Sequence, residues 1–201
     1  MRDCDTEIKI IDADWTLAKN RCRTTVNKKW TDNAPNRDFI KALLISEHSP
    51  IRAIRVAWRW DSIKSWVATH FSRHWVGWLK WIGTRRSDRT GVDRGGLSQN
   101  ELVPMEVDAN AQALINVSRF RLCFMASNET REYMEDLKTK IKLGGEEELA
   151  YVMVPNCIYR GGCPEFHTCG FWEKFKSMYP DIDYTSIQAR YDAYEESFYH
   201  G

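Results

Sequence analysis

Long hydrophobic runs are absent from this sequence of 201 residues. No apolar stretch approaches the roughly 18 residues that a helix needs to cross a bilayer, and the charged opening MRDCDTEIKI is unlike a secretory signal peptide. Hydrophobic residues still make up 43% of the chain and charged residues 28%, a balance typical of a globular protein. We therefore expect a soluble, cytoplasmic protein with a sizeable core and no membrane partner.

Several common catalytic and nucleotide-binding motifs are also missing. The sequence has no phosphate-binding P-loop, no dinucleotide-binding G-x-G-x-x-G and no nucleophile elbow G-x-S-x-G. His70 and His74 have the i, i+4 spacing of zinc ligands on a helix, but Phe71 lies where the H-E-x-x-H motif has its glutamate. The missing general base argues against a zinc hydrolase.

The six cysteines are unevenly placed along the chain. The last three of the six cysteines form, with one histidine, the pattern C-x5-C-x3-H-x-C: Cys157, Cys163, His167 and Cys169. Without a secretory signal, these cysteines are expected to be reduced. Cysteine and histidine are zinc ligands, but the spacing matches no standard zinc finger or ribbon. Two interpretations stay open: a zinc site, or plain thiols in a tight turn rich in glycine and proline.

The net charge of +1 at pH 7 hides an uneven distribution. Residues 52–94 contain ten Lys and Arg against three Asp and Glu, whereas residues 146–201 contain four against ten. A basic middle segment favours an anionic ligand or an acidic partner surface. The alternative is that the basic and acidic segments simply face each other.

Hydrophobic periodicity predicts an α+β chain with more helix than strand. Strands are expected over residues 7–15 and, from the alternation in IRVAWRW, over 54–60. Helices are expected over 16–26, 36–46, 61–75, 108–122 and 127–142, followed by a short acidic helix and two terminal helices. Residues 84–100 have the composition of a loop. We expect a single domain over residues 1–201, with a C-terminal extension that carries the Cys/His turn at about 145–201.

The basic segment combines cations with aromatic rings. Six of the nine tryptophans lie between residues 58 and 81, and indole rings can wall a flat heterocycle. Guanidinium groups match a phosphate with two parallel N–H donors, and four of them lie close together: Arg73, Arg85, Arg86 and Arg89. A bound nucleotide explains both features, although a tryptophan core with a solvated arginine rim explains them too. Nucleic-acid binding uses the same residue types, but the near-neutral charge and the lack of a known module argue against it.

Four segments of the chain, taken in order, resemble the flavin-dependent thymidylate synthases. SRHW followed by RRSDR is similar to that family's signature, R-H-R followed by N-E-x-S-x-R. Upstream, EHSPI (47–51) is similar to the segment G-H-x-[ST]-P, and WVATHFSRHW resembles the helix that enters the signature. Downstream, NAQALINVSRFRLCFMASNETR (110–131) resembles the late helix pair. Together these segments cover about residues 40–135.

The resemblance implies a flavin-dependent thymidylate synthase-like fold, with a small, mainly antiparallel sheet and a long helix bundle. It implies a homotetramer in which several subunits build each active site. FAD is the implied cofactor, with NADPH and methylenetetrahydrofolate as co-substrates. The implied reaction is the methylation of dUMP to dTMP, without a cysteine nucleophile. Short divergent members of this kind also suggest a phage or mobile-element origin.

The resemblance further implies roles for residues at matching positions. Around the flavin it implies Arg73, His74, His48, Ser49, Asn110 and Asn116. Around dUMP it implies Ser87, Arg89, Arg121, Arg73 and His70. The implied catalytic group within these sets is Ser87, Arg89, Arg121 and His48. On the helix predicted over 108–122, Asn110 and Arg121 would share one stripe, three turns apart.

Departures from the family pattern leave other functions open. Trp75 replaces the third signature residue, four extra residues separate RH from SDR, and Arg85 lies where a carboxylate is usual. The substrate is therefore open to another pyrimidine nucleotide, and the reaction to C5-hydroxymethylation. Outside the enzymes, the alternatives are a nucleotide-binding or RNA-binding relative that has lost catalysis, and a zinc-stabilised interaction module.

Overall fold

The structure is a computed structural model that describes residues 5–200. Its contacts divide the chain into two compact units. The first unit is formed by residues 5–35 and 49–113, and the second by residues 36–48 and 114–200. The chain therefore contributes a short segment to the second unit before it completes the first. Within the described residues, no helix is both long and apolar enough to span a membrane.

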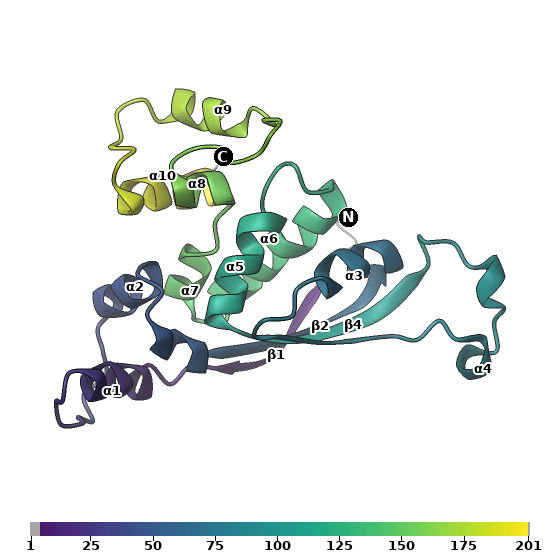
Figure 1. Cartoon of the computed structure of the whole chain (residues 1–201), viewed down its shortest axis with the longest axis horizontal. Coiled ribbons are helices and arrows are strands. Elements are labelled where there is room, and N and C mark those ends of the chain that lie inside the picture. Colours follow the sequence, from purple (N-terminus) through teal and green to yellow (C-terminus); the bar gives the residue numbers. More distant parts are fainter. Residues whose placement is uncertain (1–4, 201) are drawn as a thin grey trace. The chain divides into compact units, whose positions relative to one another are not determined.

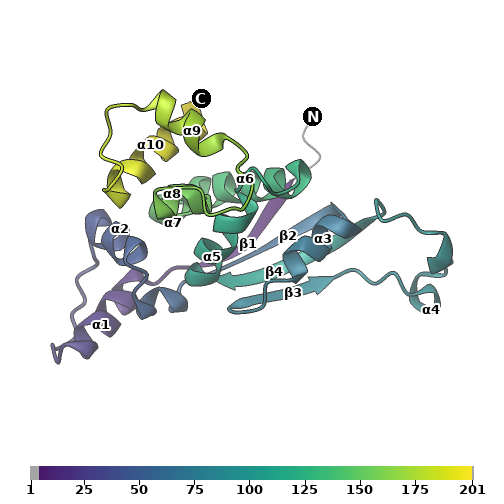
Figure 2. The same cartoon turned by 45° about the horizontal axis from the view of Figure 1, so that its top comes forward.

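The first unit is built on a four-stranded antiparallel sheet in the order β1-β2-β4-β3 (Figures 1 and 2). Its strands are β1 (Thr6–Asp12), β2 (Arg55–Lys64), β3 (Trp78–Ile82) and β4 (Leu102–Asn110). In the first half of β2, Val56, Trp58 and Trp60 are buried and Arg55 is exposed, as the alternating sequence predicts, but Ala57 on the opposite face is buried too. The strand then continues beyond Trp60 through a bulge.

Tryptophan dominates the core of the first unit. Trp58, Trp60 and Trp78 are at most 1% exposed, and Phe71 of α3 (Ser65–Ser72) is buried with them. Trp58 meets both other indoles edge to face, with ring centroids 5.6 and 5.2 Å apart. Each such ring removes on the order of 150–250 Å² of surface from water, so this cluster supplies much of the hydrophobic stabilisation of the unit. Helix α3 lies across the sheet (Figure 2).

An arm leaves the sheet between β3 and β4. The arm, residues 83–101, carries the short helix α4 (Ser87–Thr90) and the 3₁₀ turn η2 (Arg94–Gly96). Both views show α4 at the far end of the arm, away from α3 and the sheet (Figures 1 and 2). Elsewhere in this unit, α1 (Trp15–Thr25) packs on the 3₁₀-helix η1 (Ser49–Ala53).

The second unit is helical. Asn36 and Ser127 cap two of its helices, because the side chain of each accepts a hydrogen bond from the backbone N–H three residues later. Arg190 is 6% exposed and donates to the carbonyl oxygens of Ile158 and Tyr159, groups that a helix end leaves unpaired. The helices are α2 (Arg37–Ile45), most of α5 (Ala111–Arg121), α6 (Asn128–Leu143), α7 (Glu147–Tyr151), α8 (Asn156–Arg160), α9 (Phe171–Met178) and α10 (Ile187–His200).

The predicted fold class is confirmed, since the chain combines a small antiparallel sheet with a larger share of helix. Several boundaries were wrong. Residues 61–64 continue β2, because pairing with β4 extends to Lys64, so α3 begins only at Ser65. Residues 102–110 form β4, so the helix predicted over 108–122 begins at Ala111. Strand β3 was not predicted, and α4 interrupts the predicted loop. The single domain with an extension at 145–201 stays a prediction.

Candidate functional site

The turn between α3 and β3 gathers three of the residues predicted around a flavin. Arg73 is exposed at the C-terminal end of α3, and His74 follows it with its ring centroid 6.0 Å from that of buried Trp78. Immediately before this tryptophan, the carbonyl of Gly77 accepts a hydrogen bond from the backbone N–H of Asn110, 3.0 Å away. Arg73, His74 and Asn110 therefore lie at one end of the β3–β4 pair.

Asn110 has a structural role that the sequence did not reveal. It is the last residue of β4, and its Oδ1 accepts a hydrogen bond of 2.9 Å from the backbone N–H of Ala113. Asn110 thus precedes α5 and lies outside it, so the prediction that Asn110 and Arg121 share one helical stripe was wrong. A Cβ on Gly77, whose φ is +65°, would lie only 2.4 Å from Asn110 Nδ2. Glycine is required there both for the backbone conformation and for the close approach.

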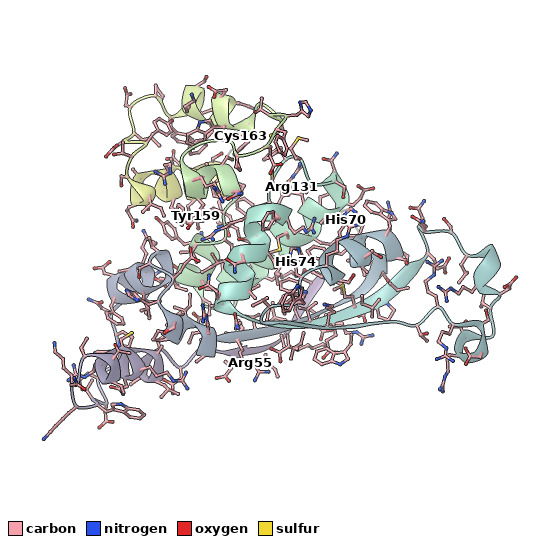
Figure 3. The ribbon with its side chains drawn as sticks, in the orientation of Figure 1. Arg55, His70, His74, Arg131, Tyr159 and Cys163 are labelled. Atoms are coloured by element: carbon pink, nitrogen blue, oxygen red, sulfur yellow. The ribbon has the colours of Figure 1, made fainter. Side chains whose placement is uncertain are left out.

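The two histidines near α3 are each fixed by a tryptophan. Helix α3 ends at Ser72, so His74 lies beyond it and the two imidazoles do not share a helix face. The His70 ring meets Trp66 edge to face, with centroids 5.3 Å apart, whereas His74 packs on Trp78. Both histidines are labelled in Figure 3 and both are partly exposed. The i, i+4 geometry of two ligands on one helix, which the sequence predicted, is therefore wrong for this pair.

Ser87 and Arg89 lie on the arm, apart from α3. Both are exposed within α4, and the Ser87 hydroxyl accepts a hydrogen bond of 2.9 Å from the backbone N–H of Arg94. Asp88 is bound at 3.0 and 2.7 Å by Arg86, and its carboxylate is 3.9 Å from Arg89 Nε. The arm presents Arg86 and Arg89 to solvent, and both views show α4 away from α3 (Figures 1 and 2).

Arg85 holds the base of the arm. Its Nη1 donates to Ser65 Oγ at 2.9 Å, and its Nη2 donates to the carbonyl of Ser98 at 2.8 Å. Its buried Nε has no hydrogen-bond partner among the described residues. The residue at the family's carboxylate position therefore joins both ends of the arm to the start of α3, a structural role.

The second unit carries three more of the predicted site residues: His48, Asn116 and Arg121. His48 is exposed and follows Glu47, whose φ is +51°. Asn116 and Arg121 lie on α5 and are partly exposed. Arg119, which the sequence analysis passed over, lies between them and donates to Glu47 Oε1 and, at 3.3 Å, to Asn116 Oδ1. This arginine links the segment before His48 to the helix that carries Asn116 and Arg121.

Ser49, predicted beside the flavin, is exposed at the start of η1 in the first unit. Its neighbour His48 belongs to the second unit. The predicted flavin and nucleotide residues are thus divided between the two units, with Arg73, His70, His74, Ser49, Ser87, Arg89 and Asn110 in the first and His48, Asn116 and Arg121 in the second.

The Cys/His segment was predicted either to bind zinc or to carry plain thiols. Between residues 5 and 200, no three His, Cys, Asp or Glu side chains lie where they could hold a metal ion, and no disulfide is present. His167 and Cys169 are exposed, while burial raises the pKa of Cys157 to about 12, with Cys123 adding to the rise. The choice between a zinc site and plain thiols stays a prediction; Cys163 of this segment is labelled in Figure 3. Cys4 lies outside the described residues.

The fold is similar to solved structures of nucleotide-modifying enzymes. A UMP/dUMP methylase, PolB from Streptomyces cacaoi, bound with 5-Br dUMP, is 14% identical; the match covers 76% of this chain and 96% of that one, with a TM-score of 0.59. Two structures of the flavin-dependent thymidylate synthase ThyX from Helicobacter pylori with FAD and dUMP are 10% and 8% identical. They cover 72% and 74% of this chain and 97% and 98% of those, with TM-scores of 0.58 and 0.59.

At such low identity these likenesses show the fold. No protein-family model matches the sequence, and a search of curated proteins gives no significant match.

Proposed function

We propose that this chain is a flavin-dependent enzyme that methylates dUMP at C5 to give dTMP. FAD is the proposed cofactor, with NADPH and methylenetetrahydrofolate as co-substrates, in a cytoplasmic setting. The observation that carries the proposal is the agreement of two likenesses. Four sequence segments resemble this family in order, and the fold resembles a UMP/dUMP methylase and thymidylate synthases bound to FAD and dUMP.

The side chains present suit these ligands. The exposed guanidinium of Arg73 can bind a diphosphate with two parallel N–H donors, next to the half-buried ring of His74 and the amide of Asn110. Arg89 and Ser87 are exposed donors for the phosphate of a nucleotide. FAD, when bound, supplies the redox chemistry. The chain's own groups bind and orient the uracil, and such orientation lowers the entropic part of the reaction barrier.

The same proposal includes a homotetramer with shared active sites. Within the first unit, the arm holds α4, which carries Ser87 and Arg89, away from α3, which ends just before His74 (Figures 1 and 2). A second copy of the chain is therefore the proposed source of the arm at each flavin site. Closed symmetry would repeat that exchange around the assembly.

A second candidate substrate is UMP, because the similar structure from Streptomyces cacaoi is a UMP/dUMP methylase. Purified protein is expected to show a flavin absorbance band. Incubation with dUMP or UMP, methylenetetrahydrofolate and NADPH, followed by mass analysis, then identifies the reaction. A gain of CH2 supports methylation, whereas a gain of CH2O indicates C5-hydroxymethylation. A colourless protein that binds neither nucleotide contradicts the proposal.

The proposed phosphate and base contacts give a direct mutational test. Arg89→Ala and Arg121→Ala should each weaken dUMP binding by more than about tenfold, because each removes a charge-assisted hydrogen bond. Arg160→Ala is a suitable control, since Arg160 is an exposed arginine that binds only Asn156 among the hydrogen bonds observed, at 3.2 Å. Isothermal calorimetry measures the affinities. Unchanged binding in both test variants would remove the nucleotide assignment.

A further inference from the structure

Arg119 is a cation enclosed within the second unit. Its side chain is 12% exposed, and its guanidinium carbon lies 3.5 Å from the centroid of the Tyr159 ring, a residue labelled in Figure 3. One nitrogen pairs with the carboxylate of Glu47, and another donates to Asn116 Oδ1 at 3.3 Å. Tyr191 is another neighbour. Burial raises the pKa of Tyr191, and the nearby positive charge of Arg119 partly offsets that rise. The Nε of Arg119 is buried without a hydrogen-bond partner among the described residues, so it is burial that leaves little of the guanidinium for a ligand.

Glu47 has a backbone conformation that needs support. Its φ of +51° lies in the left-handed region, which residues with a Cβ adopt at an energetic cost. Its side chain is 22% exposed, and the ion pair with Arg119 fixes that side chain. Because Glu47 directly precedes His48, the conformation at Glu47 sets the direction in which the chain presents His48.

The same guanidinium acts on α5. Asn116 lies three residues before Arg119, so both point from one face of the helix. The hydrogen bond orients the Asn116 amide, because its oxygen is held by Arg119. One mostly buried side chain thus constrains two segments of the candidate site that are far apart in sequence: the turn after α2 and the middle of α5.

We propose that Arg119 is a positioning residue of the nucleotide-modifying site, which fixes the Glu47–His48 backbone and the Asn116 amide without touching substrate. This inference rests on the proposed function only for its prediction about the kinetics. The pairing geometry, the burial and the positive φ at Glu47 support it independently.

The experiment compares Arg119→Met with Arg119→Lys and with a matched control, Arg131→Met. Arg131 belongs to the same unit, pairs with Glu135 at 3.0 Å and lies 4.3 Å from the Phe124 ring centroid, but contacts none of the site residues in these bonds. Hydrogen exchange of peptides spanning residues 44–50 reports on the backbone before η1. Steady-state kinetics with dUMP reports on the reaction.

Arg119→Met should speed exchange at residues 46–49 by about tenfold or more, since loss of the ion pair frees a strained segment. It should also lower kcat by about tenfold with KM for dUMP within about threefold, the pattern of lost positioning. Arg119→Lys keeps the charge but loses the two parallel N–H donors and the stacking on Tyr159. Its exchange rate and its kcat should therefore lie between those of the wild type and of Arg119→Met. Arg131→Met should match the wild type in both measurements.

A second variant keeps the test open where Arg119→Met does not fold. Glu47→Gly removes the carboxylate while leaving a residue that adopts positive φ freely, so the fold should persist and exchange at residues 47–49 should still rise. Unchanged exchange in both variants overturns the positioning role. An active wild type with unchanged kcat in Arg119→Met also overturns it. A wild type with no activity, but with the expected exchange, contradicts the proposed reaction and supports the positioning of the segment.

Discussion

At the residue scale, Lys138 is a fully buried cation that joins three helices of the second unit. Its Nζ donates to the carbonyl of Ala150 in α7 at 2.6 Å and to Glu195 Oε2 in α10 at 2.9 Å. Lys142 binds the other oxygen of the same carboxylate at 2.8 Å. Burial lowers the pKa of Lys138 to about 8, against the opposing effect of Glu195. The amine is therefore close to its titration range at mildly alkaline pH.

This lowered pKa predicts a rise in stability with pH. Between about pH 8 and the ordinary lysine value of 10.5, the unfolded chain binds a proton at Lys138 that the folded chain releases. The free energy of unfolding should then increase with pH, by on the order of 3 kcal/mol over the full range. Below pH 8, Lys138 is protonated in both the folded and the unfolded chain, so its contribution to the free energy of unfolding does not change with pH.

Lys138→Met isolates the effect, because other groups titrate in both proteins. Burial raises the pKa of Cys157, for example, and that group lowers the stability of both proteins at high pH. Urea unfolding of the wild type and the variant from pH 7 to 10.5 gives the difference curve. Above pH 8 the free energy of unfolding of the wild type should rise with pH relative to that of Lys138→Met. A difference between the two that stays constant with pH contradicts the assignment.

At the element scale, the corner between β3, β4 and α5 depends on Gly77. Gly77→Ala introduces a Cβ at a φ of +65° and 2.4 Å from Asn110 Nδ2, so Asn110 must move. Gly91→Ala is a matched control, since Gly91 has a φ of +72° but no atom within 4 Å of its Cβ position. Both variants should lose about 1 kcal/mol or more from backbone strain.

Only Gly77→Ala should also displace Asn110, whose side chain caps the start of α5 through its hydrogen bond to Ala113. Thermal unfolding should show a larger loss for Gly77→Ala than for Gly91→Ala. Under the proposed function, flavin affinity should fall in Gly77→Ala alone. Equal losses of stability in the two variants would mean that the collision with Asn110 is relieved without cost.

The elements that sequence predicts well are those with local signals. The helix predicted over 127–142 is confirmed as α6 with Ser127 at its N-cap, and Val56, Trp58 and Trp60 of β2 lie on the predicted buried face. Strand β4 could not be predicted in this way, because Pro104 lies within it and proline is usually confined to edge strands and bulges. The structure accommodates Pro104 opposite the bulge of β2, between the partners of Trp60 and Ile63. Such accommodation depends on tertiary pairing, which local patterns do not contain.

At the scale of the whole molecule, the sequence identifies candidate arginines but cannot assign their roles. Arg89 is exposed on the arm, whereas Arg85 joins the ends of the arm and Arg119 is enclosed by its neighbours. The partner of Arg119, Glu47, is 72 residues away in the chain. Long-range partners of this kind decide whether a cation binds a ligand or supports the fold. Contacts between distant parts of the chain also divide the predicted site residues between two units, which local sequence patterns do not reveal.

The position of α4 at the far end of the arm, away from α3 in the same unit, leads to a test of the assembly. If each active site combines an arm from one copy with a flavin region from another, Arg89→Ala and His74→Ala are each inactive alone but complement each other. Random mixing of the two variants by co-expression leaves about a quarter of the sites with both contributions intact, because each contribution is unaltered in half of the copies. Activity should recover to about that fraction of the wild-type value.

Arg89→Ala mixed with Ser87→Ala is the control, since both changes lie on the arm and every arm is then altered. Size-exclusion chromatography with light scattering confirms that the mixtures assemble. Recovery in the first mixture and not in the second would show that the arm acts on another copy. If neither mixture recovers while both assemble, the arm and His74 of one chain serve the same site, which contradicts the proposal of shared sites.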